Sequence, residues 1–434
     1  MIYQVKKTCV HYFDGLIPWL EQVADPRKHR HYSIGAIVQG GISLFLFRED
    51  SRNALNNDRK EKVFRDNYEN VFGLELAHMD TVDDVFRMLV PAELENVRKD
   101  MVTTLIRQRV LESGRYRSGY LVAVDGTGVV SYDHPHCECC LRKTSKKGTT
   151  TYFHHVLEAK LITPSGMSLS IGSEWINNGG KTEFDKQDCE REAFKRLAQK
   201  IKDQYPRLGV IIVADGLYPW EGFFQICKQN RWNYIVTLQD KSLKSLQEEI
   251  QWEKRFRTEQ QRQVFRVKNK KQVLLHYHWL KGLLYHGHQV NWVECVEETK
   301  NAAGEVIKKQ RFVHLSDLET DGNHCVGISD SGRLRQKIEN EGFNAQKHHG
   351  YNLEHKFSRN DFPAMKNYYQ CLQIAHIINQ LVVLSRRIVC LLEQDTKLTV
   401  KYLYKRMIAL LLEVALDTGE LENQISRRFQ VRLI

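Results

Sequence analysis

Hydrophobic residues in the first quarter of the chain recur every three or four positions, which is the spacing of helices that bury one face. After Pro91, the apolar residues Leu94, Val97, Met101 and Leu105 follow this spacing closely. The uncharged stretch 31–47 is shorter than the roughly 20 residues that cross a bilayer, so it predicts a buried helix rather than a membrane span. We therefore expect residues 1–115 to form a helical N-terminal region that is available for DNA binding.

From about residue 116 the pattern changes to short apolar, β-branched runs, which favour strands. Pro164, Ser165 and Gly166 separate two of these runs and predict a hairpin turn. The expected elements are strands 119–124, 151–163 and 167–175, helix 186–205, strand 207–214, helix 220–230 and strand 234–238. The order of three strands, helix, strand, helix, strand predicts an α/β mixed sheet over residues 116–239.

Residues 240–319 interrupt this order with short alternating segments, which predict a β-rich insertion. Its leading part, 254–271, contains eight Lys or Arg residues with aromatic residues among and around them. Such a run fits a solvated face or a nucleic-acid surface, and the aromatic residues fit stacking bases or the insertion's own small core. The basic side chains we predict to contact DNA here are Arg255, Arg257, Lys268, Lys270 and Lys271.

The last part of the chain again predicts helices. Within residues 320–360, the segment 331–349 has helical spacing, and in the C-terminal region 361–434 the segments 362–393 and 397–416 are apolar on most faces. Helices that are apolar nearly all round are buried, so we expect them to pack against the body of the protein or a second copy.

The bulk composition favours a polyanionic partner. The 434 residues include 64 Lys and Arg against 53 Asp and Glu, a net charge of +11, which suits nucleic acid before a membrane surface. Residues 1–10 have no apolar signal core, so the ten cysteines are expected to be reduced thiols in a cytoplasm.

Two apolar runs end in the same way. Residues 121–126 read L-V-A-V-D-G and residues 210–216 read V-I-I-V-A-D-G, which places Asp125 and Asp215 at the ends of two buried strands. Each Asp-Gly pair alone could simply turn the chain. Two carboxylates on neighbouring strands would instead repel each other and favour a divalent cation between them.

A third acidic position lies on the predicted helix 331–349. Four-residue spacing places Arg335 and Glu339 on one face, where Arg335 can orient the Glu339 carboxylate, while Glu341 points elsewhere. An ordinary salt bridge on a surface helix has the same pattern. The segment therefore indicates a catalytic site only when it is considered together with the two strands that end in Asp.

Taken together, the three segments resemble the DDE transposases of bacterial insertion sequences, in the branch whose ribonuclease-H-like catalytic domain carries a β-strand insertion. The resemblance covers roughly residues 116–360. In that family the first Asp ends the first core strand, the second ends the fourth, and the Glu lies on a helix after the insertion. Asp125, Asp215 and Glu339 match in order and local structure, and the insertion explains the 124 residues between Asp215 and Glu339.

The family's helix motif is Tyr, two residues, Arg, three residues, Glu, six residues, Lys. Arg335 and Glu339 keep the spacing, whereas Gly332 occupies the Tyr position and Gln346 the Lys position, with Lys347 one residue later. Lys347 is therefore the candidate equivalent of the motif's Lys. Taking Glu341 as the catalytic residue instead would give a poorer match.

The resemblance implies a function, cofactors and partners. Asp125, Asp215 and Glu339 would be catalytic and would hold two Mg²⁺ or Mn²⁺ ions for hydrolysis at transposon ends and 3′-OH strand transfer into target DNA. The partners would be double-stranded DNA, as terminal inverted repeats and target, and a second copy in a synaptic complex. It also implies a cytoplasmic, nucleoid-associated prokaryotic protein and no membrane partner. The alternatives are a nuclease of the same fold without strand transfer and a domesticated DNA-binding protein that no longer cuts.

A cysteine–histidine segment lies between the first two predicted strands. Cys137 and Cys140 have zinc-ligand spacing, and His154 or His155 could complete a site. There is no second Cys-x-x-Cys, and neighbouring residues of a strand face opposite ways. The sequence thus favours reduced thiols over a structural zinc, beside a loop whose Lys143, Lys146 and Lys147 are predicted to contact DNA.

Overall fold

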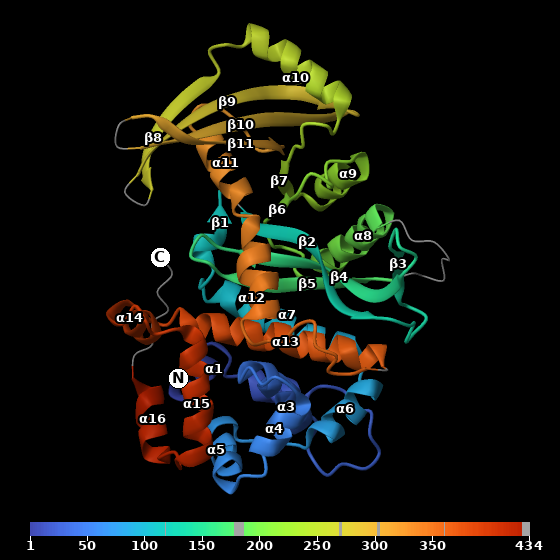
Figure 1. The fold of residues 1–434 in the computed structure, drawn as a ribbon, viewed down its shortest axis with the longest axis vertical. Coiled ribbons are helices and arrows are strands. Elements are labelled where there is room, and N and C mark those ends of the chain that lie inside the picture. The colour runs from blue at the N-terminus through green and yellow to red at the C-terminus, as the bar shows by residue number, and fades with distance from the viewer. Residues whose placement is uncertain (118, 178–185, 269–270, 302–303, 360, 428–434) are drawn as a thin grey trace.

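The computed structural model describes residues 1–117, 119–177, 186–268, 271–301, 304–359 and 361–427. In the view of Figure 1, helices from both ends of the chain form the lower part of the molecule, the centre of a mixed sheet lies above them, and the β-rich insertion is at the top. The predicted α/β class with a mixed sheet and flanking helical regions is therefore confirmed.

The helices of the two terminal regions pack against each other. The N-terminal helices are α1 (Ile2–Tyr12), α2 (Leu16–Glu21), α3 (Ile34–Leu46), α4 (Arg52–Asp58), α5 (Lys62–Phe72), α6 (Met79–Met88), α7 (Pro91–Arg107) and the 3₁₀ turn η1 (Glu112–Gly114). The C-terminal helices are α13 (Phe362–Val383), α14 (Arg386–Gln394), α15 (Val400–Glu413) and α16 (Thr418–Ser426). The central helix α13 contacts α3, α6 and α7, and every residue of α3 is buried. The prediction of a buried helix is therefore confirmed for 31–47 and for the first part of 362–393. It is wrong for the rest, because the chain turns after Val383, α14 buries only Ile388, and α15 buries only Tyr404, Met407 and Leu411.

The sheet has eleven strands, namely β1 (Arg115–Tyr116), β2 (Gly119–Tyr132), β3 (Leu141–Thr144), β4 (Thr150–Ile162), β5 (Ser168–Ile176), β6 (Val210–Ala214), β7 (Asn233–Thr237), β8 (Gln261–Lys268), β9 (Lys271–Tyr285), β10 (His288–Lys300) and β11 (Val306–Ser316). The order is β3-β4-β2-β6-β7-β11-β10-β9-β8, with β1 beside β2 and β5 beside β4. Strands β2, β6 and β7 are parallel, and the other pairs are antiparallel. The insertion is thus not a separate sheet, because β11 pairs with β7 of the core.

Alternate residues of the central strands enter two different cores. Val122 and Val124 pack with Phe194 of α8 (Lys186–Gln204) and with the terminal helices. Leu121 and Ala123 pack with residues of α11 (Cys325–Arg333) and of the π-helical segment η2 (Ile338–Asn344). Helix α9 (Glu221–Asn230) also belongs to the first side, through Phe223 and Phe224. The central strands are therefore buried on both faces, which explains their continuous apolar runs.

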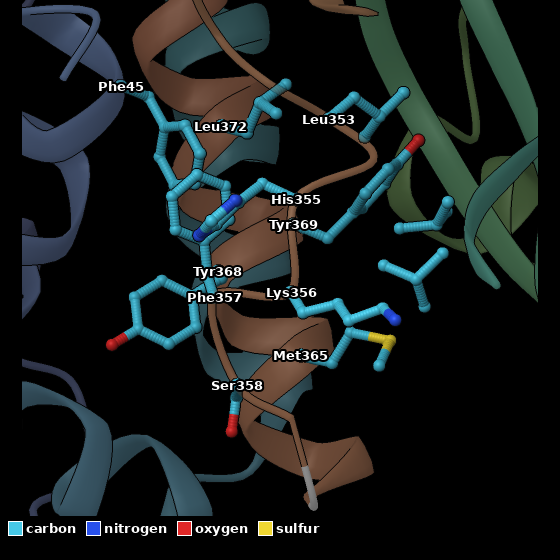
Figure 2. A pocket seen from close by; sticks show the side chains of 12 residues that line it. Phe45, Leu353, His355, Lys356, Phe357, Ser358, Met365, Tyr368, Tyr369 and Leu372 are labelled. Atoms are coloured by element: carbon cyan, nitrogen blue, oxygen red, sulfur yellow. The ribbon is translucent and has the colours of Figure 1, made fainter. Parts of the chain in front are cut away.

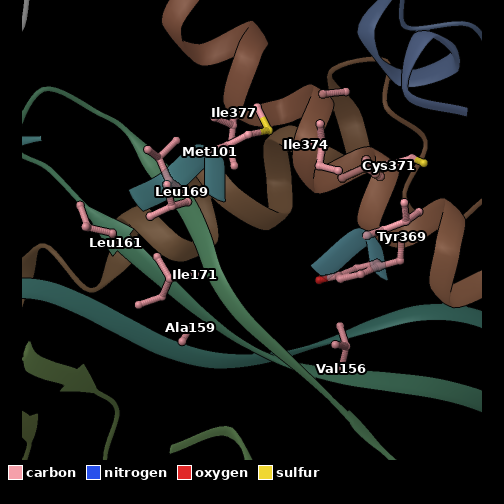
Figure 3. Close-up of a cluster of buried hydrophobic side chains, with 14 of the residues drawn as sticks. Met101, Val156, Ala159, Leu161, Leu169, Ile171, Tyr369, Cys371, Ile374 and Ile377 are labelled. Atoms are coloured by element: carbon pink, nitrogen blue, oxygen red, sulfur yellow. The ribbon is translucent and has the colours of Figure 1, made fainter. Parts of the chain in front are cut away.

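Helices α7 and α13 cover β4 and β5 through a compact apolar contact. Figure 3 shows Met101 of α7, Ile374 and Ile377 of α13, and Leu161 and Ile171 of the strands meeting in this cluster. The contact fixes the strand that runs beside β2, and β2 carries Asp125.

Two predicted elements differ from the structure near the candidate site. Strand β2 does not stop at Asp125, because β4 pairs with it as far as Tyr132, and the Asp-Gly pair lies inside the strand. The predicted helix 331–349 is divided into α11, a turn at Leu334 and Arg335, η2, and α12 (Ala345–His348). Helix α10 (Lys244–Phe256), at the start of the insertion, was not predicted from the sequence.

Candidate functional site

Asp125 lies on β2, and Asp215 directly follows the parallel neighbouring strand β6. The last pair of the β2–β6 ladder is Ala123 with Val213, and each aspartate follows its strand's member of that pair by two residues. By strand alternation both side chains belong to the face that α11 and η2 cover. Although β2 continues past Asp125, its partner β6 ends at Ala214, so one edge of β2 opens here. The predicted juxtaposition of the two aspartates is present.

Arg335 is the counter-ion of Asp125. Its guanidinium Nη1 donates to Asp125 Oδ2 at 3.1 Å, and both side chains are largely buried, at 20% and 27% exposure. The sequence predicted instead that Arg335 would orient Glu339. That expectation assumed one continuous helix, whereas Arg335 lies in the turn before η2, from which it reaches across to β2.

Neighbouring groups shift the pKa of the Asp125 carboxyl group in opposite directions. Burial raises its pKa above the usual value, and the Arg335 guanidinium acts against this. The negative charges of Asp215 and Glu339 raise the pKa further, while the Gly126 N–H, which donates to Oδ1 at 2.9 Å, lowers it. The charges of Asp215 and Glu339 thus both act on Asp125, and such repulsion between carboxylates favours a bound cation.

Glu339 and Glu341 have different surroundings on η2. Glu339 is exposed, and its charge reaches Asp125. Glu341 forms an ion pair with Lys337 and lines a cleft of about 410 Å³ together with His348 and His349. On this π-helical segment, Glu339 therefore lies near Asp125, whereas Glu341 lines the cleft.

The three carboxylates do not form a closed ligand set in this structure. Among the described residues, the only group of three or more His, Cys, Asp or Glu ligand atoms within 4.8 Å of one another lies elsewhere, in the cysteine–histidine cluster below. The donor chemistry nevertheless fits Mg²⁺ or Mn²⁺, because carboxylate oxygens are the hard ligands that these ions prefer.

Sequence reasoning missed three side chains beside the aspartates. The buried Tyr218 lies three residues after Asp215, and burial together with the charges of Glu190, Asp125 and Asp215 raises its pKa well above the usual value. A Cβ atom at Gly126 would lie 3.2 Å from Glu190 Oε1 and 3.3 Å from His155 Nε2. The position of Tyr218, two residues after the second Asp-Gly pair, was the only available signal, since Glu190 belongs to α8.

The predicted basic residues have varied environments. Lys143, Lys146 and Lys147 are exposed in and beside β3, and Arg255 and Lys271 are exposed on the insertion. Arg257 pairs with Glu253, and Lys347 pairs with Glu354 at 2.8 Å. Lys270 lies outside the described residues, as does the side chain of Lys268.

The aromatic residues of the insertion divide into two groups. Trp279 and Trp292 are buried in the strands, as a small core would require, whereas Trp252, Phe256 and Phe265 are exposed. Trp252 and Phe256 lie together on α10, with ring centroids 4.6 Å apart. The small-core interpretation therefore holds for Trp279 and Trp292, and base stacking by the exposed rings stays a prediction.

A cysteine–histidine cluster brings together His136, Cys137, Cys140 and His154. The Sγ atoms are 3.7 Å apart, His154 Nε2 lies 3.5 Å from Cys137 Sγ and 3.7 Å from Cys140 Sγ, and the two Nε2 atoms are 3.0 Å apart. Burial lowers the pKa of His154 to about 3 and also lowers that of His136, which favours the neutral form of each imidazole. Of the predicted ligands, Cys137, Cys140 and His154 belong to this cluster, whereas His155 does not. His136 belongs to it as well but was not predicted from the sequence.

A small cavity elsewhere in the molecule is too small for a substrate. It lies between α3, α13 and the segment 353–358, where Phe45, Phe357 and Tyr368 line it (Figure 2). Its volume of about 20 Å³ has room for about one water molecule.

Comparison with known proteins does not assign this chain. No family model matches it, and no curated protein sequence matches it. Among the described residues, every helix is too short or too polar to cross a membrane.

Proposed function

We propose that this protein is a DDE transposase with a ribonuclease-H-like catalytic domain, which hydrolyses phosphodiester bonds at transposon ends and transfers the 3′-OH ends into target DNA. The observation that carries the proposal is the register of Asp125 and Asp215 on parallel β2 and β6, together with the charge of Glu339 acting on Asp125. The order β2, β4, β5, α8, β6, α9, β7 supports it, because Asp125 then lies on the first core strand and Asp215 follows the fourth.

Each residue of the site has a distinct task in this proposal. Asp125, Asp215 and Glu339 would hold the metal ions, and Arg335 would favour the charged form of the Asp125 carboxyl by opposing the rise in its pKa that burial causes. When bound, Mg²⁺ supplies an activated attacking oxygen and stabilises charge at phosphorus and on the leaving oxygen. Glu339 is favoured over Glu341, because Glu341 is paired with Lys337 and faces the neighbouring cleft.

A transposase must also bind DNA, and the charge of the chain supports this part of the proposal. A net charge of +11 and exposed lysines near the catalytic sheet suit phosphate contacts. The exposed pair Trp252 and Phe256 on α10 would add stacking contacts to unpaired bases.

The test uses the DNA that flanks this protein's own coding sequence as candidate transposon ends. Labelled fragments are incubated with purified protein, target plasmid and Mg²⁺, and we expect 3′-OH ends followed by joined products. Asp125→Asn, Asp215→Asn and Glu339→Gln should each abolish cutting and keep DNA binding. Glu341→Gln is the matched control on the same helix and should still cut.

The outcomes separate the alternatives. Cutting without joined products would assign a nuclease, and binding without cutting by the unmodified protein would assign a DNA-binding protein that has lost catalysis. Full strand transfer by any of the three carboxylate variants would reject the site.

A further inference from the structure

We propose that His136, Cys137, Cys140 and His154 bind one structural Zn²⁺ ion. The proposal is independent of DNA cleavage, because it concerns different residues and a different class of metal ion. It is carried by the geometry of four ligand atoms that come from two separate segments, the loop 133–140 and strand β4.

Four of the six distances among these atoms are close to the edges of a tetrahedron around zinc, and all six are within 4.8 Å. Bonds of about 2.3 Å to sulfur and 2.0–2.1 Å to nitrogen imply edges of about 3.8 Å between sulfurs, 3.6 Å between sulfur and nitrogen, and 3.3 Å between nitrogens. The observed separations are 3.7 Å for the Sγ pair, 3.5 and 3.7 Å from His154 Nε2 to the two Sγ atoms, and 3.0 Å for the Nε2 pair. A disulfide does not explain the cluster, because its sulfurs would be about 2.0 Å apart.

The donor set selects both the metal and its role. Two thiolates and two imidazoles in a tetrahedron favour zinc over the oxygen-preferring Mg²⁺. Four protein ligands leave no open position for water or substrate, which is the arrangement of structural rather than catalytic zinc.

The surroundings show what the ion would stabilise. The segment 133–140 contains no strand or helix, so few backbone hydrogen bonds hold it. His154 stacks on Phe362 at the start of α13, with centroids 4.3 Å apart and 17° between the planes, and His136 packs edge-on against Tyr132 at 4.2 Å. Zinc would therefore fasten the loop to β4 and α13, and with it β3 and the exposed lysines beyond it.

The first test measures zinc in protein purified without a histidine tag. Elemental mass spectrometry is expected to find one zinc per chain that survives dialysis against Mg²⁺. Protein produced with Co²⁺ should show the intense visible bands of tetrahedral cobalt together with a thiolate-to-cobalt charge-transfer band. Less than a tenth of an equivalent of zinc, with no cobalt spectrum, would overturn the proposal whether or not any variant folds.

Variants then identify the ligands. Cys137→Ser, Cys140→Ser and His136→Ala should each lower the zinc content at least tenfold, whereas His136→Cys should keep it by supplying a replacement thiolate. Cys139→Ser is the matched control, because this cysteine lies between the two ligands in sequence but outside the cluster. Equal zinc loss in Cys139→Ser and Cys140→Ser would contradict the assignment.

Discussion

At the scale of single residues, the Asp125 carboxylate lies between one cation and two anions. Arg335 pairs with it at 3.1 Å, while Asp215 and Glu339 repel its charge. Because burial and repulsion outweigh the ion pair, the pKa of Asp125 is raised. The folded protein then binds a proton at this carboxyl more readily than the unfolded chain does, so Asp125 destabilises the fold at neutral pH, and the destabilisation is relieved as the pH falls through the raised pKa.

The change Asp125→Asn should therefore stabilise the metal-free protein at pH 7. We expect the free energy of unfolding to rise, because the neutral amide removes a buried charge that Asp215 and Glu339 repel. Added Mg²⁺ should raise the melting temperature of the unmodified protein but not that of the variant. Asp133→Asn, an exposed control, should change neither; a loss of stability in Asp125→Asn would contradict this electrostatic account.

Arg335 is expected to set the pH range in which the site binds metal. Protons and metal ions compete for Asp125, so Mn²⁺ affinity should fall as the pH drops through the raised pKa of this carboxyl. Arg335→Gln removes the cation that lowers the pKa, and the fall in affinity should move to higher pH. Mn²⁺ titrations followed by electron paramagnetic resonance across pH measure this, and identical pH profiles for both proteins would rule out the assigned role of Arg335.

At the scale of elements, the sequence predicted the parts of the site that depend on local pattern. Continuous apolar runs identified β2 and β6, and the helix that starts at Pro91 begins there in the structure. The extension of β2 past Asp125 was not predictable, because it depends on pairing with β4. The division of the helix 331–349 depends on packing against the sheet, and it decides which carboxylate Arg335 meets. The place of His136 in the cysteine–histidine cluster was missed because the spacing rule started from the two cysteines, whereas the fold places the loop beside β4.

Strand β4 and helix α13 are joined by a buried polar contact as well as by the apolar cluster. Glu158 and Lys160 are both fully buried and 3.7 Å apart, Tyr369 donates to Glu158 at 2.8 Å, and Lys160 donates to Gln373 at 2.8 Å. Each charge depends on the other, since a buried ion without its partner is strongly unfavourable.

Lys160→Met should therefore destabilise the protein by about 3 kcal/mol, because it leaves the Glu158 carboxylate unpaired. The double variant with Glu158→Gln should recover most of this loss. Lys309→Met removes an exposed partner of Glu298 and should leave the stability nearly unchanged, because solvent screens exposed ion pairs. Urea denaturation provides the values; equal effects of Lys160→Met and Lys309→Met would show that the buried pair is not coupled.

At the scale of the whole molecule, the helices of both termini cover β4 and β5, and the insertion extends the sheet beyond β7 (Figure 1). Exposed basic side chains lie toward both ends of the sheet. Lys143, Lys146 and Lys147 are in and beside β3, and Arg255 is on α10 of the insertion. A DNA duplex bound at the carboxylates would have cationic side chains available on either side of the cleavage point.

The triple change of Lys143, Lys146 and Lys147 to Ala should weaken DNA binding and reduce its dependence on salt. The slope of log affinity against log salt should decrease by about 0.9 for each lost phosphate contact, or about 2.7 in all. Alanine at Lys397, Lys405 and Arg406, which are exposed among the C-terminal helices, removes the same charge and should leave the slope nearly unchanged. Equal slope changes in both triple variants would indicate that only net charge matters.

The most direct measurement of the central claim is a crystal structure of the protein soaked with Mn²⁺, with anomalous diffraction recorded at the manganese edge. We expect manganese peaks in contact with carboxylate oxygens of Asp125 and Asp215, with the Glu339 side chain turned toward them. Crystals of Asp125→Asn treated in the same way should lack these peaks. Manganese absent from Asp125 and Asp215 at millimolar concentration, or bound only through Glu341, would contradict the assignment of the three carboxylates.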